Sequence, residues 1–377
     1  MPIESVPSRA WHVGVAADSR GASDRSMPAI TTYRVDPITD PRWADFLNAQ
    51  DCASVFHSVG WLQALQLTYG YEPFALTTSA PSERLKNALV FCRIRSWLTG
   101  NRMVSLPFAD HCQPLVESPE SMEALLTGVR EEQARASDKY IELRPRNAPP
   151  DTAAQWPLKE SSLYYFHTLD LRPDRECLFS NLHKSCVQRK IQRAEREQLK
   201  YERGRSEELL ARFYKLLLLT RRRHQLPPQP MSWFRNLLDS LGEEATIHVA
   251  SKAGQPVASI FTLRFKRTLV YKYGGSDQRF HKLGGMPFLF WKAIEEAKQR
   301  GDEEFDLGRS DRDNEGLVSF KEHLGATRST LAYFSYPEGG SAVPSKGWKM
   351  RLLRSTFEWM PDSLLATAGR LLYKHVG

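Results

Sequence analysis

The stretch from residue 269 to residue 334 decides the fold. It reads LVYKYGGSD (269–277), QRFHKLGGMPFLFWKAIEEAKQRG (278–301) and EEFDLGRSDRDNEGLVSFKEHLGATRSTLAYF (303–334). The first piece carries the β-branched and aromatic residues of a strand and ends in two glycines. The second begins a helix at Gly284 and Gly285, places Pro287 in its first turn and ends at Gly301. The third begins with a short strand that ends at Gly308. This order predicts a strand–helix–strand unit that presents a helix N-terminus to an anionic or carbonyl ligand.

With the ending FDLGRS (305–310) and NEGLVSFKEHLGA (314–326), this unit resembles the second half of FemAB-like acyltransferases. These are tandem folds of the GNAT superfamily, and the resemblance is to its CelD-like or BioF-like branch. It covers residues 33–336 and is strongest over 182–325. It implies a mixed α/β (α+β) fold class with two GNAT-like domains, each a mixed central sheet flanked by helices. The glycine pair in RFHKLGGM (279–286) has a different spacing to basic residues from the usual nucleotide loop, which weakens the case for coenzyme A.

Length, charge and cysteine content narrow the class of protein. A chain of 377 residues with 41% hydrophobic residues suits two domains with sizeable cores. The net charge of +8 favours an anionic partner, such as a phosphate-bearing cofactor, a nucleic acid or a lipid surface. The five cysteines include no CxxC motif and no nearby histidine pair, so neither a disulfide framework nor a metal is expected. They indicate reduced thiols in a cytoplasmic protein. No apolar run approaches the ~20 residues that span a bilayer.

The order of predicted elements repeats along the chain. The motifs DKYIEL (138–143) and DEEFDL (302–307) fall at the same point of each repeat, so we expect two similar, separate mixed sheets in which Leu143 matches Leu307. In the second repeat, helices are expected over Glu176–Leu199 and Glu207–His224. The resulting division is a disordered leader (1–29), a first GNAT-like domain (30–172), a second GNAT-like domain with the donor site (173–337), and a linker with basic amphipathic C-terminal helices (338–377).

Candidate catalytic residues lie in the second repeat. N-acyl transfer needs a nucleophilic amine, a polarised carbonyl and stabilised charge on the tetrahedral intermediate. Asp306 and Arg309 end a strand, where reacting groups gather; alternatively they form a turn cap and its ion pair. The resemblance implies that Phe320 and Lys321 lie by the acyl group of the donor, where Lys321 would act on the oxyanion. Spacing alone would make Lys321 a surface lysine. Asn314 can bind the acyl carbonyl or cap the following helix. Asp306 and Lys321 are therefore the predicted catalytic residues.

Other residues are candidates for binding. Gly284 and Gly285, together with Asn314 and Phe320, are predicted to bind the donor. Asp110 and His111 follow a first-repeat strand and can bind or deprotonate an amine, or else form a turn with an exposed histidine. Arg189 begins a row of cations on one helical face, which can dock a phosphate-bearing substrate or simply face solvent. With Arg309 these residues form the predicted substrate site. The row is Arg189, Arg193, Arg196 and Lys200.

The sequence therefore predicts an N-acyltransferase that works by direct transfer. The donor would be an acyl thioester on coenzyme A or acyl carrier protein, and the acceptor a primary amine of a sugar, an amino acid or an envelope or polysaccharide precursor. One alternative is an aminoacyl-tRNA-dependent FemAB-type peptidoglycan transferase, but residues 199–244 lack the heptads of its coiled-coil arm. Another is a non-catalytic binding or assembly protein for polysaccharide export. The basic tail can dock on the protein or place it peripherally on the inner membrane surface.

Overall fold

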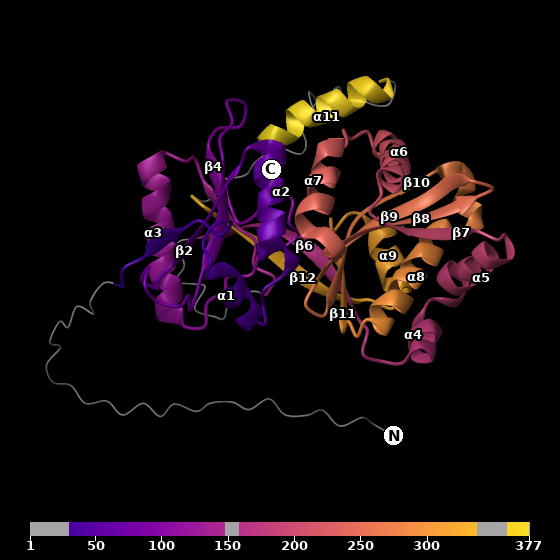
Figure 1. Ribbon diagram of the computed structural model, residues 1–377, viewed down its shortest axis with the longest axis horizontal. Helices are drawn as coiled ribbons and strands as arrows, with labels where there is room; N and C mark the ends of the chain where they lie inside the picture. Colours follow the sequence, from indigo (N-terminus) through magenta and orange to yellow (C-terminus); the bar gives the residue numbers. More distant parts are fainter. Residues whose placement is uncertain (1–29, 148–157, 338–359, 377) are drawn as a thin grey trace, which may run out of the picture.

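Two halves lie side by side and share one central sheet (Figure 1). The computed structural model describes residues 30–147, 158–337 and 360–376. The first half is drawn in indigo and magenta, the second mainly in orange, and the C-terminal helix in yellow. The predicted leader and the predicted linker between the second half and the tail lie outside the described residues.

The first half has the order of strand, two helices, strands, helix and strand. Its second helix begins where Ser58 accepts a hydrogen bond from the Trp61 N–H, and its third where Ser118 accepts one from Ser121. The elements are β1 (Tyr33–Val35), α1 (Trp43–Ala49), η1 (Val55–His57), α2 (Val59–Tyr69), β2 (Glu72–Thr77), β3 (Leu89–Ile94), β4 (Arg102–Val104), α3 (Pro119–Ala136) and β5 (Ile141–Leu143).

The second half repeats this order with additions. The first half ends with β6 (Lys159–Asp170). The elements of the second half are α4 (Arg175–Asn181), η3 (Lys184–Gln188), α5 (Arg189–Arg196), β7 (Lys200–Gly204), α6 (Glu207–Arg223), α7 (Met231–Leu241), η4 (Gly242–Glu244), β8 (Ala245–Lys252), β9 (Gln255–Phe265), β10 (Thr268–Ser276), η5 (Gln278–Leu283), α8 (Gly285–Gln299), β11 (Glu304–Ser310), α9 (Glu315–His323) and β12 (Thr327–Tyr336). The prediction of one continuous helix over Glu176–Leu199 is wrong, because this segment forms α4, η3 and α5. Leu182 is extended there, and the His183 side chain accepts the Cys186 N–H, which starts a π-helical turn.

The strand order of the sheet is symmetric about its centre, because β1 to β6 occupy the same positions from one edge as β7 to β12 occupy from the other. The order is β1-β2-β3-β4-β5-β12-β6-β11-β10-β9-β8-β7. Its two parallel pairs are β4 with β5 and β10 with β11. Val104 pairs with Glu142 in the first, and Val270 pairs with Asp306 in the second. The repeated motifs therefore occupy equivalent places in the sheet.

The expectation of two separate sheets is wrong. β12 crosses to the first half, where Phe334 pairs with Leu143 of β5, and β6 pairs with β11 of the second half. β6 and β12 also pair with each other, from Thr327 opposite Thr168 to Ser335 opposite Lys159. Long unpaired strand edges template aggregation, and this exchange leaves neither half with one at the centre. The two halves become one continuous sheet.

Among the described residues there are four apolar clusters, and the three larger ones form the cores that flank this sheet. The largest spans both halves, because α2 of the first half packs on α7 of the second, with the Trp61 and Trp233 rings 5.2 Å apart. A second core lies under α8 and contains Leu269, Phe305 and Leu307. A third lies under α3. Val270 and Leu269 alternate between the first two cores, as strand geometry requires.

The last helix, α11 (Asp362–Val376), is docked on both halves. The Tyr71 hydroxyl donates to the Tyr373 carbonyl oxygen at 2.9 Å, and the Tyr373 hydroxyl donates to Pro227 at 3.2 Å. Leu365 is fully buried, while Leu364 and Leu371 are 57% and 63% exposed. Among the described helices, none is long and apolar enough to cross a membrane.

The docked position of α11 requires a residue without a side chain at Gly369. A Cβ there would lie 2.0 Å from the Pro228 carbonyl oxygen, so Gly369→Ala should lift α11 and cost about 1–3 kcal/mol of stability. Gly316→Ala in α9 is the matched control, because its Cβ would meet nothing within 4 Å. Thermal unfolding of both variants measures the difference. Equal stability of Gly369→Ala and wild type would contradict this docking.

Candidate functional site

His111 and Asp306, which come from different halves, meet at the centre of the sheet. His111 Nε2 lies 2.9 Å from Asp306 Oδ2, and both side chains are 2% exposed. An ionised carboxylate only accepts hydrogen bonds, so Nε2 is assigned as the donor and Nδ1 carries the lone pair. Asp306 Oδ1 accepts the Gly308 N–H at 2.7 Å, which fixes the carboxylate. Within the described part of the chain, His111 Nδ1 has no hydrogen-bond partner.

A cavity of about 170 Å³ lies beside this pair, between the two halves. The first half contributes the segment before α2 and residues that follow β4 and β5, and the second half contributes the end of β9, the start of β10 and Asp306. One water occupies about 30 Å³ in the liquid, so this space suits a reacting group rather than a whole acyl donor. The lining residues are Asp51, Cys52, Ala53, Ser54, Val55, His111, Gln113, Arg146, Asn147, Phe265, Thr268, Val270 and Asp306.

Asp110 forms a partly buried charge cluster next to the pair. Its Oδ2 lies 3.0 Å from Lys272 Nζ, its Oδ1 lies 3.9 Å from Arg309 Nε, and its carbonyl oxygen accepts the Tyr333 hydroxyl at 2.6 Å. Burial alone would raise the pKa of the Asp110 carboxyl, but the Lys272 and Arg309 charges outweigh burial and hold this pKa below its usual value. Asp110 is therefore a charged partner of the second half.

Gly308 makes room for this cluster. It takes a φ of +72°, at the irregularity in the β11–β6 ladder between Asp306 and Arg309. A Cβ at this position would lie 2.8 Å from Asp110 Oδ2. The glycine that ends the predicted strand is thus required both by the backbone conformation and by the close approach of Asp110.

Lys321 lies under the same strand and is not a surface lysine. It is 3% exposed, and its Nζ donates to the carbonyl oxygens of Gly308 and Arg309, each at 2.9 Å. Burial disfavours the ammonium and lowers the pKa of Lys321 to about 8, although the charges of Asp110 and Asp306 oppose this shift. Two of its three N–H groups are occupied by main-chain oxygens.

Other predicted residues lie further along the second half. Asn314 accepts the Leu317 N–H at 3.2 Å and so caps α9, and Phe320 packs on Phe290 with ring centroids 5.3 Å apart. Gly284, with a φ of +79°, precedes Gly285 at the N-terminus of α8. A Cβ on Gly284 would lie 2.3 Å from the Lys190 carbonyl oxygen, so α5 packs tightly here.

Arg189, the first residue of α5, is exposed beside this packed corner. Figure 1 places α5 at the outer edge of the second half, apart from the central strands β6 and β12. The predicted residues therefore form a central group and an outer group. The central group is Asp110, His111, Asp306, Arg309 and Lys321; the outer group is Arg189, Gly284 and Gly285.

Lys272 and Arg146 belong to the centre but were not predicted. Lys272 is the extra residue of a β-bulge, because Tyr271 and Tyr273 pair with consecutive residues of β9. Bulges redirect side chains next to functional sites, and a lysine inside an apolar strand was the available signal. Arg146 lies 2.5 Å from Glu304 and has no local pattern that would reveal this partner.

Sequence and structure comparisons agree with this architecture. The family model described as Acetyltransferase (GNAT) domain matches residues 183–321. No curated protein matches the chain by sequence. Among solved structures, FemX is similar at a TM-score of 0.64 and 13% identity, covering 81% of this chain and 97% of that one.

Two further solved structures have related folds. The tandem GNAT protein from the clavulanic acid biosynthesis pathway has a TM-score of 0.52 and 14% identity, covering 84% of this chain and 100% of that one. A C-terminal domain from Agrobacterium fabrum, assigned to a lysylphosphatidylglycerol synthetase, has a TM-score of 0.53 and 14% identity, covering 84% and 94% of the two chains. At such identities the likeness establishes the fold.

The GNAT domain over residues 183–321 and the fold shared with FemX and the tandem GNAT protein bear out the predicted fold of tandem GNAT-like halves and the predicted resemblance to FemAB-like acyltransferases. The protein is therefore an acyltransferase.

The partly buried charge cluster predicts strong coupling between Asp110 and Lys272. Asp110→Asn leaves the Lys272 ammonium, whose side chain is 6% exposed, without its closest carboxylate, and should cost about 3 kcal/mol. Adding Lys272→Met should recover part of this loss, so the two effects are not additive. Urea unfolding measures the cycle. The control is Asp170→Asn, which breaks an exposed pair with Arg172 and should cost at most about 1 kcal/mol. Additive effects would show that the pair is not coupled.

Proposed function

We propose that the protein transfers an acyl group directly from an acyl thioester, on coenzyme A or acyl carrier protein, to a primary amine of a sugar, an amino acid or an envelope or polysaccharide precursor. The observation that carries this proposal is the His111–Asp306 pair beside the cavity between the halves. An amine must lose a proton to become a nucleophile, and a buried imidazole held by a carboxylate is suited to accept it.

In this proposal His111 is the general base and Asp306 positions it. With Nε2 donating to Asp306, the Nδ1 lone pair of His111 is the atom that takes the proton of the amine. The imidazolium that forms is then stabilised by the Asp306 carboxylate. Asp110, whose charge is already balanced by Lys272 and Arg309, holds the surrounding cations in place.

Lys321 supplies positive charge for the oxyanion. Its third N–H is not used by the carbonyl oxygens of Gly308 and Arg309, so it can be donated to the oxygen of the tetrahedral intermediate. Phe320 on the same helix and Asn314 at its N-cap would then contact the acyl portion of the donor. Gly284, Gly285 and Arg189 would bind the distal, phosphate-bearing part of the donor or acceptor at the outer end of the half.

A thioester donor is favoured over aminoacyl-tRNA by the shape of the second half. Between residues 199 and 244, α6 and α7 have 17 and 11 residues, and both pack into the shared core instead of projecting as an arm. Titration calorimetry of the full chain with acetyl-CoA, longer acyl-CoAs, acylated carrier protein and aminoacyl-tRNA tests the donor. Binding of only the tRNA would overturn the thioester proposal, and binding of none would favour the non-catalytic alternative.

Substitution of Lys321 tests the oxyanion role. Lys321→Met should lower kcat more than donor affinity, by about 2–4 kcal/mol in barrier, because the charge develops only in the transition state. Lys298→Met is the control, since that lysine is half-buried at the end of α8 and donates to the Arg172 carbonyl oxygen. Steady-state kinetics on variants with wild-type circular dichroism provide the measurement. Unchanged turnover would leave Lys321 a structural role only.

The pH dependence of kcat follows from the same residue. An ammonium with a pKa of about 8 is charged below this pH and neutral above it, so kcat should fall as pH rises through 8. Lys321→Arg keeps its charge and should move this descending limb to higher pH. A pH–rate profile between 6 and 10 would show it (about the range over which a lysine of this kind titrates). A profile that rises through 8 would instead make Lys321 a base.

Peripheral contact with an anionic membrane is the proposal for the tail. Because α11 is docked, its outer face with Leu364, Leu371, Arg370 and Lys374 is what remains to meet lipid. After sedimentation with phosphatidylglycerol vesicles, the wild type should be found in the pellet and Leu371→Glu should remain in the supernatant. Recovery of both proteins in the supernatant would exclude this contact and leave α11 a structural role.

A further inference from the structure

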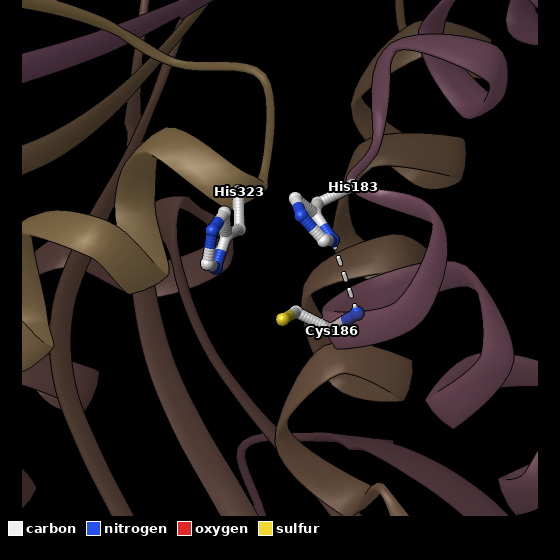
Figure 2. A group of neighbouring side chains, drawn as sticks. All are labelled: His183, Cys186 and His323. Carbon is white, nitrogen blue, oxygen red and sulfur yellow. Dashed lines mark hydrogen bonds between the residues drawn. The ribbon is translucent and has the colours of Figure 1, made fainter.

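Two histidines and a cysteine gather at the surface of the second half, away from the His111–Asp306 pair. His183 precedes the π-helical turn η3, Cys186 lies within that turn, and His323 is the last residue of α9. Figure 2 shows the two imidazole rings facing each other with the Cys186 sulfur beneath them. One potential ligand atom from each residue lies within 4.8 Å of the other two. The ring centroids of the histidines are 4.2 Å apart.

The backbone holds these side chains in place. The His183 N–H donates to the His323 carbonyl oxygen at 2.8 Å, which ties the two segments together directly. Each segment is anchored in the core beside its histidine, since Leu182 is 3% exposed and Leu324 is 1% exposed. Val187, next to Cys186, is also buried at 1%. The cluster is therefore prearranged on two fixed elements, which is what a metal site requires.

The donor atoms select a particular class of ion. A thiolate with two imidazoles suits a borderline-soft metal such as Zn²⁺, whereas Mg²⁺ and Ca²⁺ prefer oxygen ligands. Zn–N bonds of about 2.0–2.1 Å and Zn–S bonds of about 2.3 Å fit atoms that are already this close, after small side-chain rotations. His183 Nδ1 accepts the Cys186 N–H at 3.2 Å, so one hydrogen bond is exchanged or a ring proton moves when the ion binds.

We propose that His183, Cys186 and His323 bind one Zn²⁺ ion, with the fourth position taken by water or by a ligand from outside this cluster. His183 is exposed and the other two residues are half-buried, so an ion can reach the cluster from solvent. No metal was expected from the sequence, because it has no CxxC motif and no nearby histidine pair. His183 and Cys186 are three residues apart, but the third ligand comes from α9 and arrives only with the fold.

The ion would join η3 and α5 to the helix that carries Lys321. His323 is two residues beyond Lys321 on α9, so a bound ion would fix the end of this helix against the π-helical turn. This inference does not rest on the proposed acyl transfer, and its test is independent of activity.

The test uses the full chain after reduction and removal of metal with a chelator. Zn²⁺ is titrated in competition with a chromophoric chelator, and Co²⁺ is titrated in parallel, because a thiolate-to-cobalt charge-transfer band reports cysteine ligation. Variants Cys186→Ala and His323→Asn remove one ligand each. Cys177→Ala is the matched control, since Cys177 is an exposed thiol on the neighbouring α4 and lies outside the cluster.

We expect about one ion per chain for wild type and for Cys177→Ala, with the charge-transfer band present in both. Cys186→Ala should lose the band, and either cluster variant should lose about 100-fold or more in affinity. Zn²⁺ should raise the Tm of wild type and not that of Cys186→Ala. Absence of binding, binding without the band, or an equal loss in Cys177→Ala would each overturn the site.

Discussion

The antiparallel ladder between β6 and β12 is the constraint on which the rest of the structure depends. In the sequence, β6 comes just before the second half and β12 ends it. β6 lies beside the parallel pair β10–β11, β12 lies beside the parallel pair β4–β5, and the two strands pair with each other. Without it, each half would present a long open edge of unpaired N–H and C=O groups. With it, two half-sheets become one, and α2 packs against α7 over the seam.

Burial at the seam explains the chemistry of the centre. Charges removed from water persist only when they are paired, and here Asp110 from one half meets Lys272 and Arg309 from the other. The same low-polarity surroundings lower the pKa of the Lys321 ammonium. A preorganised group of charges between two halves is an arrangement that can stabilise a transient oxyanion better than water can.

The two repeats have diverged in what they contribute. Glu142 and Asp306 hold equivalent places in the sheet, yet Glu142 pairs with Arg144 of its own strand region and Asp306 pairs with His111 of the other half. The first repeat thus supplies side chains to a centre built on the strands of the second. The GNAT domain match over residues 183–321 falls on that second repeat.

The sequence by itself determined the features that depend on near neighbours. The glycines around α8 and the repeated motifs were predicted, because propensity, turn chemistry and side-chain periodicity act over a few residues. The tandem fold class was also predicted, from the repeated order of elements and from the resemblance of these motifs to FemAB-like acyltransferases. Asp306 and His111 could be named as candidates from their positions after strands, whereas Lys321 could be named only from the resemblance.

Only the tertiary structure decided which of these residues meet. The pairing of His111 with Asp306, the burial of Lys321 and the approach of His323 to His183 and Cys186 join residues far apart in the chain. Alternation reveals which face of a strand a residue occupies but not which strand lies beside it. That choice is set by the exchange of β6 and β12, a long-range pairing for which the local sequence carries no code.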